Sequence, residues 1–273
     1  MRASRTHTVA YGAALTALLT CAAAHAESSG EPLPAFGPGE QSTYRLKYLG
    51  ISAGTATVTV GDVSPDAAPT AEPIWPIVML AKSDSLLGLF PVRDRIITFW
   101  DAHHARIIST ELFADEGHHR HRQKVEMDHA RGTARVTKQK EGEASVQSNV
   151  QIQPGTQDMA AATFALRGKR LEVGQSYTIP VFTGSKSFPL RASVETVQKI
   201  KTALGEREVF RLRIQTAFSG KFESKRDMFA YLTTDGRHLP VRIEASFLLG
   251  TIVAELTDYK QGRVLASLSP HPG

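Results

Sequence analysis

Alternation of apolar and polar residues is the sequence feature that most constrains how this chain can fold. Tyr44, Leu46 and Tyr48 alternate with Arg45 and Lys47, and valines alternate with threonines in residues 55–60. A half-buried β-strand has this period of two. Such segments recur about every ten residues with turn signals between them. The sequence therefore predicts a mainly β fold, a curled antiparallel sheet in the form of an open barrel, a spiral or a sandwich.

The stretch LGISAG, residues 49–54, places small residues inside the first alternating run. A hairpin whose glycines supply positive φ is the simplest explanation, and a long strand bent by a bulge is the alternative. Small side chains also leave room beside a strand. Gly54 and Ala56 are therefore candidates to border a ligand-binding space.

One segment departs from the period of two. In TQDMAAATFALRGKR, Thr156 or Asp158 can cap a helix, apolar residues follow at helical spacing, and Gly168 comes after the last turn. We expect one short plug helix near residues 157–168. This helix divides the predicted strands into two runs of similar length. A single domain with two sub-sheets, divided near residues 156–170, is therefore an alternative.

The N-terminus has the features of a secretory signal. Arg2 and Arg5 precede an uncharged, mostly apolar run, and small residues at the end of AHA predict cleavage after Ala26. The run is shorter than the ~20 residues that span a bilayer. A lipoprotein signal that lipidates Cys21 is an alternative, which the bulk of Thr20 disfavours.

These features divide the chain into four parts. We expect a signal peptide over residues 1–26, a flexible leader over 27–39, a single β-rich domain over 40–262 and a tail over 263–273. The mature chain has no cysteine, because Cys21 is the only one. It therefore has no disulfides and no thiolate chemistry, and it folds on its core alone.

The charge balance argues against a nucleic-acid partner. The chain has 32 Lys and Arg against 27 Asp and Glu, and removal of two arginines with the signal leaves a formal charge of +3. This is too small a charge to suggest nucleic-acid binding, and export argues further against it. The mature sequence also predicts no transmembrane segment, and we expect the protein in the periplasm.

Basic residues concentrate between residues 118 and 140, a segment with seven Lys and Arg residues and only two acidic residues. A stripe of cations would attract lipopolysaccharide phosphates or other anionic envelope components, although an ordinary solvated strand has the same composition. The candidate basic surface consists of Arg120, Arg122, Lys124, Arg135, Lys138 and Lys140.

Histidines in the same region raise the question of a metal. His119 and His121 share one face of a strand, and with His103 or His104 from a neighbouring strand they could hold zinc. A polar, solvated strand explains the same residues, and there is no HExxH spacing. We expect no metal and no cofactor.

A further candidate is the apolar knuckle in SDSLLGLFPVRDR. Its residues could form a lid over an apolar cavity or a lip that touches membrane, or they could be a packed short helix that closes the sheet. The candidate ligand-binding residues here are Leu86, Leu87, Leu89 and Phe90.

The sequence offers no catalytic set. It has no GxSxG elbow and no glycine-rich phosphate loop, and its acids are isolated in the sequence. We therefore expect a protein that is not an enzyme.

Three segments in order resemble one family. They are GEQSTYRLKYLGISAGTATVTV, QDMAAATFALRGKRLEVGQSYTIPVF and MFAYLTTDGRHLPVRIEASFLLGTIVAELTDY, spanning residues 39–259. Together they are similar to the bacterial exported family known as domain of unknown function 3108. The resemblance implies a Gram-negative periplasmic protein and transfers no catalytic residues. A more distant similarity, in architecture only, is to curled-sheet envelope proteins, among them lipoprotein carriers whose motifs this chain lacks.

The expected function follows from export, the curled sheet and this resemblance. We expect a non-catalytic envelope protein that binds an apolar or amphiphilic ligand such as a lipid. One alternative is a scaffold or interaction protein that contacts lipopolysaccharide or envelope partners through its basic strand. A second alternative is a metal-dependent hydrolase built on the histidines.

Overall fold

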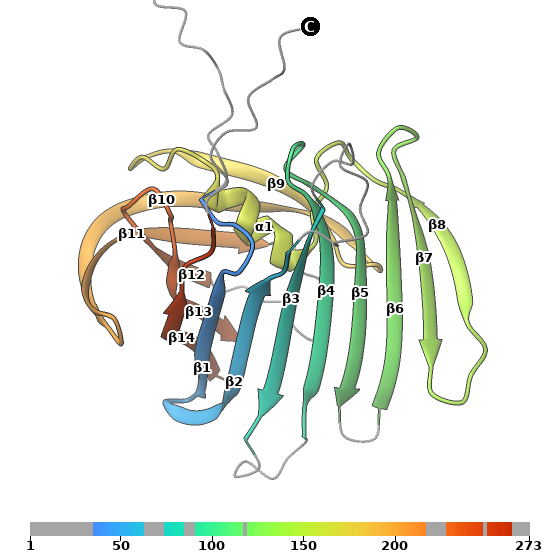
Figure 1. Ribbon diagram of the computed structural model, residues 1–273, viewed down its shortest axis with the longest axis horizontal. Coiled ribbons are helices and arrows are strands. Elements are labelled where there is room, and N and C mark those ends of the chain that lie inside the picture. The colour runs from blue at the N-terminus through green and yellow to red at the C-terminus, as the bar shows by residue number, and fades with distance from the viewer. Residues whose placement is uncertain are drawn as a thin grey trace, which may run out of the picture. The chain divides into compact units, whose positions relative to one another are not determined.

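The computed structural model describes residues 35–62, 74–84, 91–116, 119–216, 228–247 and 250–263. These residues form one antiparallel sheet of fourteen strands and one helix (Figure 1). The elements are β1 (Gln41–Tyr48), β2 (Ile51–Val60), β3 (Ile74–Ser83), β4 (Arg93–Asp101), β5 (Arg106–Glu116), β6 (His119–Asp128), β7 (Thr133–Lys140), β8 (Val146–Gln151), α1 (Met159–Arg167), β9 (Ser176–Phe182), β10 (Ser187–Thr202), β11 (Gly205–Thr216), β12 (Met228–Thr233), β13 (Pro240–Phe247) and β14 (Gly250–Lys260).

The sheet consists of two meanders that meet in its middle. The chain runs outward from β1 to β8 at one edge, passes through α1, and returns from β9 at the other edge to β14, which pairs with β1. Both runs of strands belong to this one sheet, and β8 and β9 are not hydrogen-bonded to each other. The predicted mainly β, curled antiparallel sheet with one short helix is confirmed.

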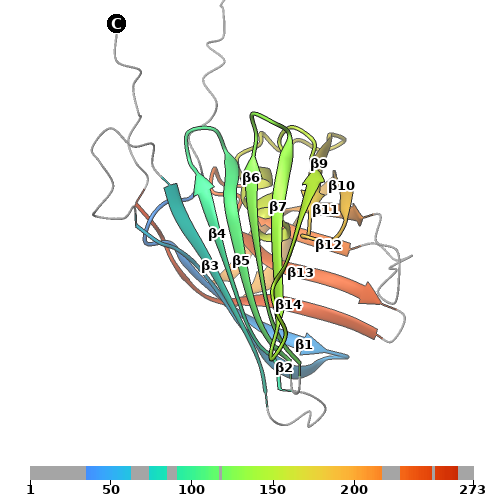
Figure 2. The same ribbon diagram turned by 90° about the vertical axis from the view of Figure 1, so that its right-hand side faces the viewer.

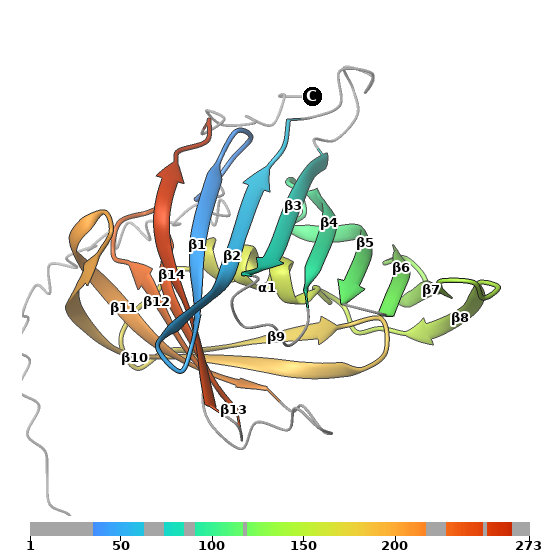
Figure 3. The same cartoon turned by 90° about the horizontal axis from the view of Figure 1, so that it is seen from below.

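The curl brings strands from opposite halves of the sheet into contact. Phe182 at the end of β9 packs with Val125 of β6 and Val136 of β7, and the side-chain amide of Gln123 donates to the carbonyl oxygen of Thr183 at 3.0 Å. Figure 2 shows β6 and β7 in front of β9 and β10, and Figure 3 shows β9 and β10 curving back beneath α1. Side-chain packing therefore joins the halves where no backbone ladder does.

The first hairpin explains the small residues in LGISAG. Leu49 and Gly50 have φ of 51° and 82°, the pair of positive values that a two-residue hairpin turn requires. Tyr48 pairs with Ile51 across this turn, and the register then shifts so that Ala53 has no direct partner. The segment therefore contains both features that the sequence suggested, the hairpin turn and a bulge.

A buried carboxylate fixes the start of α1 to the sheet. Asp158 is the N-cap, and its Oδ1 accepts the backbone N–H of Ala161 at 2.6 Å. Its other oxygen, Oδ2, accepts the hydroxyls of Thr98 on β4 at 2.5 Å and Thr110 on β5 at 2.6 Å. The helix start is thereby tied to two neighbouring strands of the first meander.

A buried ion pair fixes the end of α1 to the segment before β1. Both terminal nitrogens of Arg167 donate to the Glu40 carboxylate, at 2.6 and 3.1 Å, and Arg167 is only 3% exposed. The same guanidinium donates to the carbonyl oxygens of Ala35 and Arg237. These four bonds use most of its donors, which a charge buried this deeply requires.

The two faces of α1 pack against different parts of the sheet. Ala161 and Phe164 contact an aromatic cluster that includes Trp75 and Trp100 of the first meander. The opposite side of the helix contacts β9 to β12 through Ala162 and Leu166. The helix is therefore the centre of the core, where both meanders meet.

We predict that Asp158→Ala destabilises the fold by about 3 kcal/mol or more. The substitution removes the helix cap and leaves two buried hydroxyls without their acceptor. Urea unfolding followed by circular dichroism measures the loss. Asp258→Ala, at an exposed position on β14, is the control and should change the free energy of unfolding by less than about 0.5 kcal/mol. Equal effects of the two substitutions would contradict the role of Asp158.

Tyr44 and Tyr259 make the fold sensitive to alkaline pH. Burial raises the pKa of Tyr44 to about 12, and burial together with the nearby Glu40 charge raises that of Tyr259 to about 12. The ordinary value is 10.0, so the unfolded chain ionises first as the pH rises. The stabilisation is complete below pH 10 and is lost as the pH rises toward 12.

We predict that Tyr44→Phe flattens this alkaline loss of stability. The phenol donates to the carbonyl oxygen of Pro240 at 3.0 Å, so the variant is also less stable near pH 7, by about 1 kcal/mol. Urea unfolding at several pH values between neutral and 12 measures both effects. An unchanged slope above pH 10 would show that Tyr44 ionises as easily in the folded state as in the unfolded chain.

Candidate functional site on the inner face of the sheet

The inner face of the sheet, the side that faces α1, is buried where the helix covers it. Alternate residues of each strand point to this face. Next to the helix they include Val60 of β2, Ile77 of β3 and Thr98 of β4. In the second meander Val241 of β13 and Leu256 of β14 are also buried, in a cluster with Tyr44 and Tyr231 that contains no residue of α1. Apart from the two tyrosines, all of these residues are at most 2% exposed. This part of the face is core.

Farther along the same strands, away from α1, the inner face is mostly apolar and only half-buried, with Ser83 and Asp94 as polar residues among the apolar ones. Ile252 is 41% exposed there. Two rows of paired residues cross neighbouring strands there. One runs through Ile243, Ala254, Leu46 and Gly54, and the other through Met79, Ile96 and Leu112. We call the apolar residues of this region the helix-distal inner surface. Ile252 is exposed, and the others are half-buried: Leu46, Ala56, Met79, Ile96, Leu112, Ile243 and Ala254.

Gly54 and Ala56, predicted to border a ligand space, lie at this surface. Ala56 is half-buried there. Gly54 is buried, and a Cβ at this position would collide with the carbonyl oxygen of Lys82 and lie 2.9 Å from Ser83 Cα. The glycine is thus explained by the close approach of the β2 and β3 backbones. The knuckle residues Leu86, Leu87, Leu89 and Phe90 lie outside the described residues.

The six residues of the predicted basic surface lie on opposite faces of β6 and β7. Lys138 pairs with Gln123, and Lys140 pairs with His121, on the inner face. The other four, Arg120, Arg122, Lys124 and Arg135, point to the outer face. The sequence placed all six together because it did not give the register between the two strands.

Several of these cations have acidic partners. Arg120 contacts Asp115 and Glu141, each at 3.2 Å, and Lys124 contacts Glu126 at 2.9 Å. These pairs are exposed and contribute little to stability. They do lower the positive potential of the strand, so it is less basic than its composition suggests.

The histidines considered for zinc are not brought together. His103 lies in the turn before β5, and His121 lies beside the other end of that strand. A strand of this length spans roughly 30 Å, far beyond any shared coordination sphere. The side chain of His119 is not among those that the structure describes. Within the described ranges, no group of three or more His, Cys, Asp or Glu residues could hold a metal.

The helix-distal inner surface is a feature that the sequence did not predict as a whole. Its residues appear in the alternation as the apolar positions of separate strands. Which of them become core depends on where α1 and the curled sheet cover each strand, and this is a property of the folded chain. The sequence does contain a signal for Arg93 and Arg95 in VRDRIITF, because two arginines spaced two residues apart lie on one face of a strand. The sequence analysis did not identify this pair.

No helix in the described part of the chain combines the length and apolar composition needed to cross a membrane.

Comparison with known proteins supports the fold and a family. The family model described as "Protein of unknown function (DUF3108)" matches residues 43–257. No curated protein matches the chain. A beta-barrel-like protein of domain of unknown function DUF1849 from Brucella abortus has a similar structure, with a TM-score of 0.56 and 10% identity over 83% of this chain and 99% of that chain. A putative lipoprotein from Parabacteroides distasonis, with a TM-score of 0.32 and 8% identity over 84% and 99%, is too distant to support an argument.

We predict that Gly54→Ala destabilises the protein by about 2 kcal/mol or more, because the added methyl group forces the β2 and β3 backbones apart. Thermal and urea unfolding measure the change. Gly168→Ala is the matched control, since a Cβ there meets its nearest neighbour at an ordinary 3.7 Å. If both substitutions had equal effects, close backbone approach would not be the reason for the glycine.

Proposed function

We propose the function of this chain from its own surface, because the chain belongs to the DUF3108 family and the function of that family is unknown. The protein is an exported envelope protein that binds an apolar or amphiphilic ligand, such as a lipid, on the helix-distal inner surface. The observation that carries this proposal is the incomplete burial of apolar residues on a face whose other half is core.

The composition of this surface favours an acyl chain over a polar ligand. Six of its eight residues are Leu, Ile or Met and two are Ala. Covering such side chains contributes roughly 25 cal/mol per Å² of apolar area removed from water. Contiguous apolar patches on soluble proteins often mark binding sites. An acyl chain in contact with these two rows would be held mainly by this effect.

The same inner face becomes polar toward β6 and β7. His121, Gln123, Lys138 and Lys140 follow Leu112 across the sheet on this side. An amphiphile could place its chain on the apolar strands and its polar group near these residues. This arrangement favours a ligand with an anionic or hydrogen-bonding head over a simple hydrocarbon.

Export to the periplasm is part of the proposal. The expected signal peptide ends at Ala26, and the expected single β-rich domain covers residues 40–262. Lipidation at Cys21 would instead anchor the protein to a membrane. Mass spectrometry of the intact exported chain distinguishes a start at Glu27 from a lipidated Cys21.

We predict that protein purified gently from a periplasm carries a lipid. Native mass spectrometry should show an added mass that is released by organic extraction. The extracted protein should then bind a fluorescent long-chain fatty acid. Because the contact is apolar, the affinity should change little with salt.

A matched pair of double variants tests where the ligand binds. Met79→Gln with Ile243→Gln makes the inner surface polar and should weaken fatty-acid binding by about tenfold or more. Leu80→Gln, next to Met79 on β3, with Val253→Gln on β14, the strand that pairs with β13, changes two residues that point to the outer face, and this variant should bind normally. Absence of any bound lipid or probe, or equal loss in both variants, would rule out the proposed surface.

A further inference from the structure

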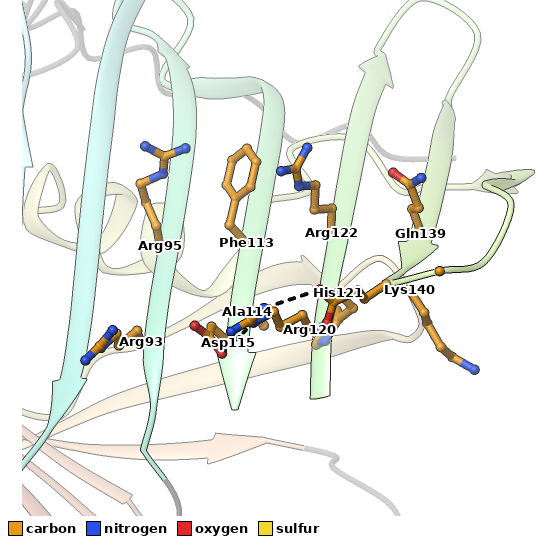
Figure 4. A pocket seen from close by; sticks show the side chains of 12 residues that line it. Arg93, Arg95, Phe113, Ala114, Asp115, Arg120, His121, Arg122, Gln139 and Lys140 are labelled. Carbon is orange, nitrogen blue, oxygen red and sulfur yellow. Dashed lines mark hydrogen bonds and ion pairs between the residues drawn. The ribbon is translucent and has the colours of Figure 1, made fainter. Parts of the chain in front are cut away.

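The outer face of the sheet contains a hollow of about 480 Å³ at the ends of β4 to β7 (Figure 4). Arg93 and Arg95 reach it from β4, and Arg120 and Arg122 reach it from β6. Phe113 of β5 lies between Arg95 and Arg122, because the three residues are direct partners across the three strands. Two arginines therefore flank one aromatic ring, and Arg93 and Arg120 lie in the row below (Figure 4).

Stacking on Phe113 orients two of these arginines. The guanidinium carbon of Arg95 lies 4.4 Å from the ring centroid, and that of Arg122 lies 5.4 Å from it. A stacked guanidinium is held by its face, and its N–H groups remain available at the edge. Phe113 therefore positions two planar hydrogen-bond donors without using the donors themselves.

The carboxylates in the hollow leave most of its positive charge unpaired. Asp115 and Glu141 are the two acids that line it, and both form their ion pairs with Arg120. Among the described residues, Arg93, Arg95 and Arg122 form no ion pair. Three arginines without an acidic partner thus converge on one concave site, and this is an arrangement that favours an anion.

We propose that this hollow binds a ligand that bears two linked phosphate groups, with Arg95 and Arg122 each holding one phosphate. Arginine pairs with phosphate oxygens through two parallel N–H donors. Because β5 separates β4 from β6, the two arginines start from backbones roughly 10 Å apart. A diphosphate fills such a gap better than a single phosphate. Arg93, in the row below (Figure 4), adds charge at the rim of the hollow.

The arginines of this site point to the opposite face of the sheet from the proposed lipid surface, and its test does not depend on that proposal. The hollow reaches the strand ends, where the inner-face residues His121 and Lys140 also line it. Inorganic pyrophosphate is the probe, and isothermal titration calorimetry with the full chain is the measurement. We expect saturable binding at low ionic strength. The affinity should fall steeply between about 0.01 and 0.15 M salt, since the Debye length shortens from ~30 to ~8 Å. Orthophosphate should bind about tenfold or more weakly.

Four substitutions separate a built site from general attraction to a basic surface. Arg95→Gln and Arg122→Gln should each weaken pyrophosphate binding by about tenfold or more. Arg135→Gln removes the same charge from the same face of β7 outside the hollow, and it should weaken binding less than twofold. Phe113→Leu keeps the charge and should still weaken binding severalfold, because the guanidiniums lose their stacking partner.

Three results would overturn the proposal. They are the absence of pyrophosphate binding at low salt, equal losses in the three arginine variants, and equal affinity for orthophosphate and pyrophosphate.

Where pyrophosphate binds as expected, sedimentation with vesicles identifies the source of the phosphates. Retention on vesicles that contain a lipid with a diphosphate head, but not on phosphatidylcholine alone, assigns the site to a membrane-borne ligand. Absence of retention assigns it to a soluble ligand.

Discussion

The attachment of both ends of α1 to the sheet is the constraint on which the rest of the structure depends. At the start, Asp158 joins the helix to β4 and β5. At the end, Arg167 joins it to Glu40, immediately before β1. Charged groups this deeply buried are stable only when their hydrogen-bonding capacity is used. The helix therefore has one position in which both ends are satisfied, and the sheet must curl around that position.

The position of the helix decides which part of the inner face is core. The helix covers the strand ends near Trp75, Trp100 and Leu232, which are at most 2% exposed, and it leaves the other ends of the same strands half-buried. The apolar surface proposed as a lipid site is thus a part of the inner face that the helix does not cover. On the opposite face, cross-strand pairing alone gathers the arginines around Phe113.

Local patterns in the sequence were sufficient to predict most of the elements. Alternation indicated the strands other than β8, and a cap at Thr156 or Asp158 together with Gly168 predicted the helix to within about two residues. The family resemblance was also confirmed. The candidate sites depended on information that is not local. The basic stretch divides between two faces because of the register between β6 and β7. The histidines separate because β5 lies between them, and Gly54 meets the backbone of a strand almost thirty residues away.

The most direct test of the account is the chemical accessibility of the inner face before and after removal of lipid. Cys21 is the only cysteine of the sequence and lies in the segment expected to be the signal peptide, so single cysteines can be introduced cleanly. Met79→Cys reports the inner face, and Leu80→Cys, where the native side chain is 48% exposed, reports the outer face. The account predicts that a thiol reagent labels residue 79 slowly in gently purified protein and rapidly after organic extraction, while residue 80 reacts equally in both. An unchanged rate at residue 79 would contradict it.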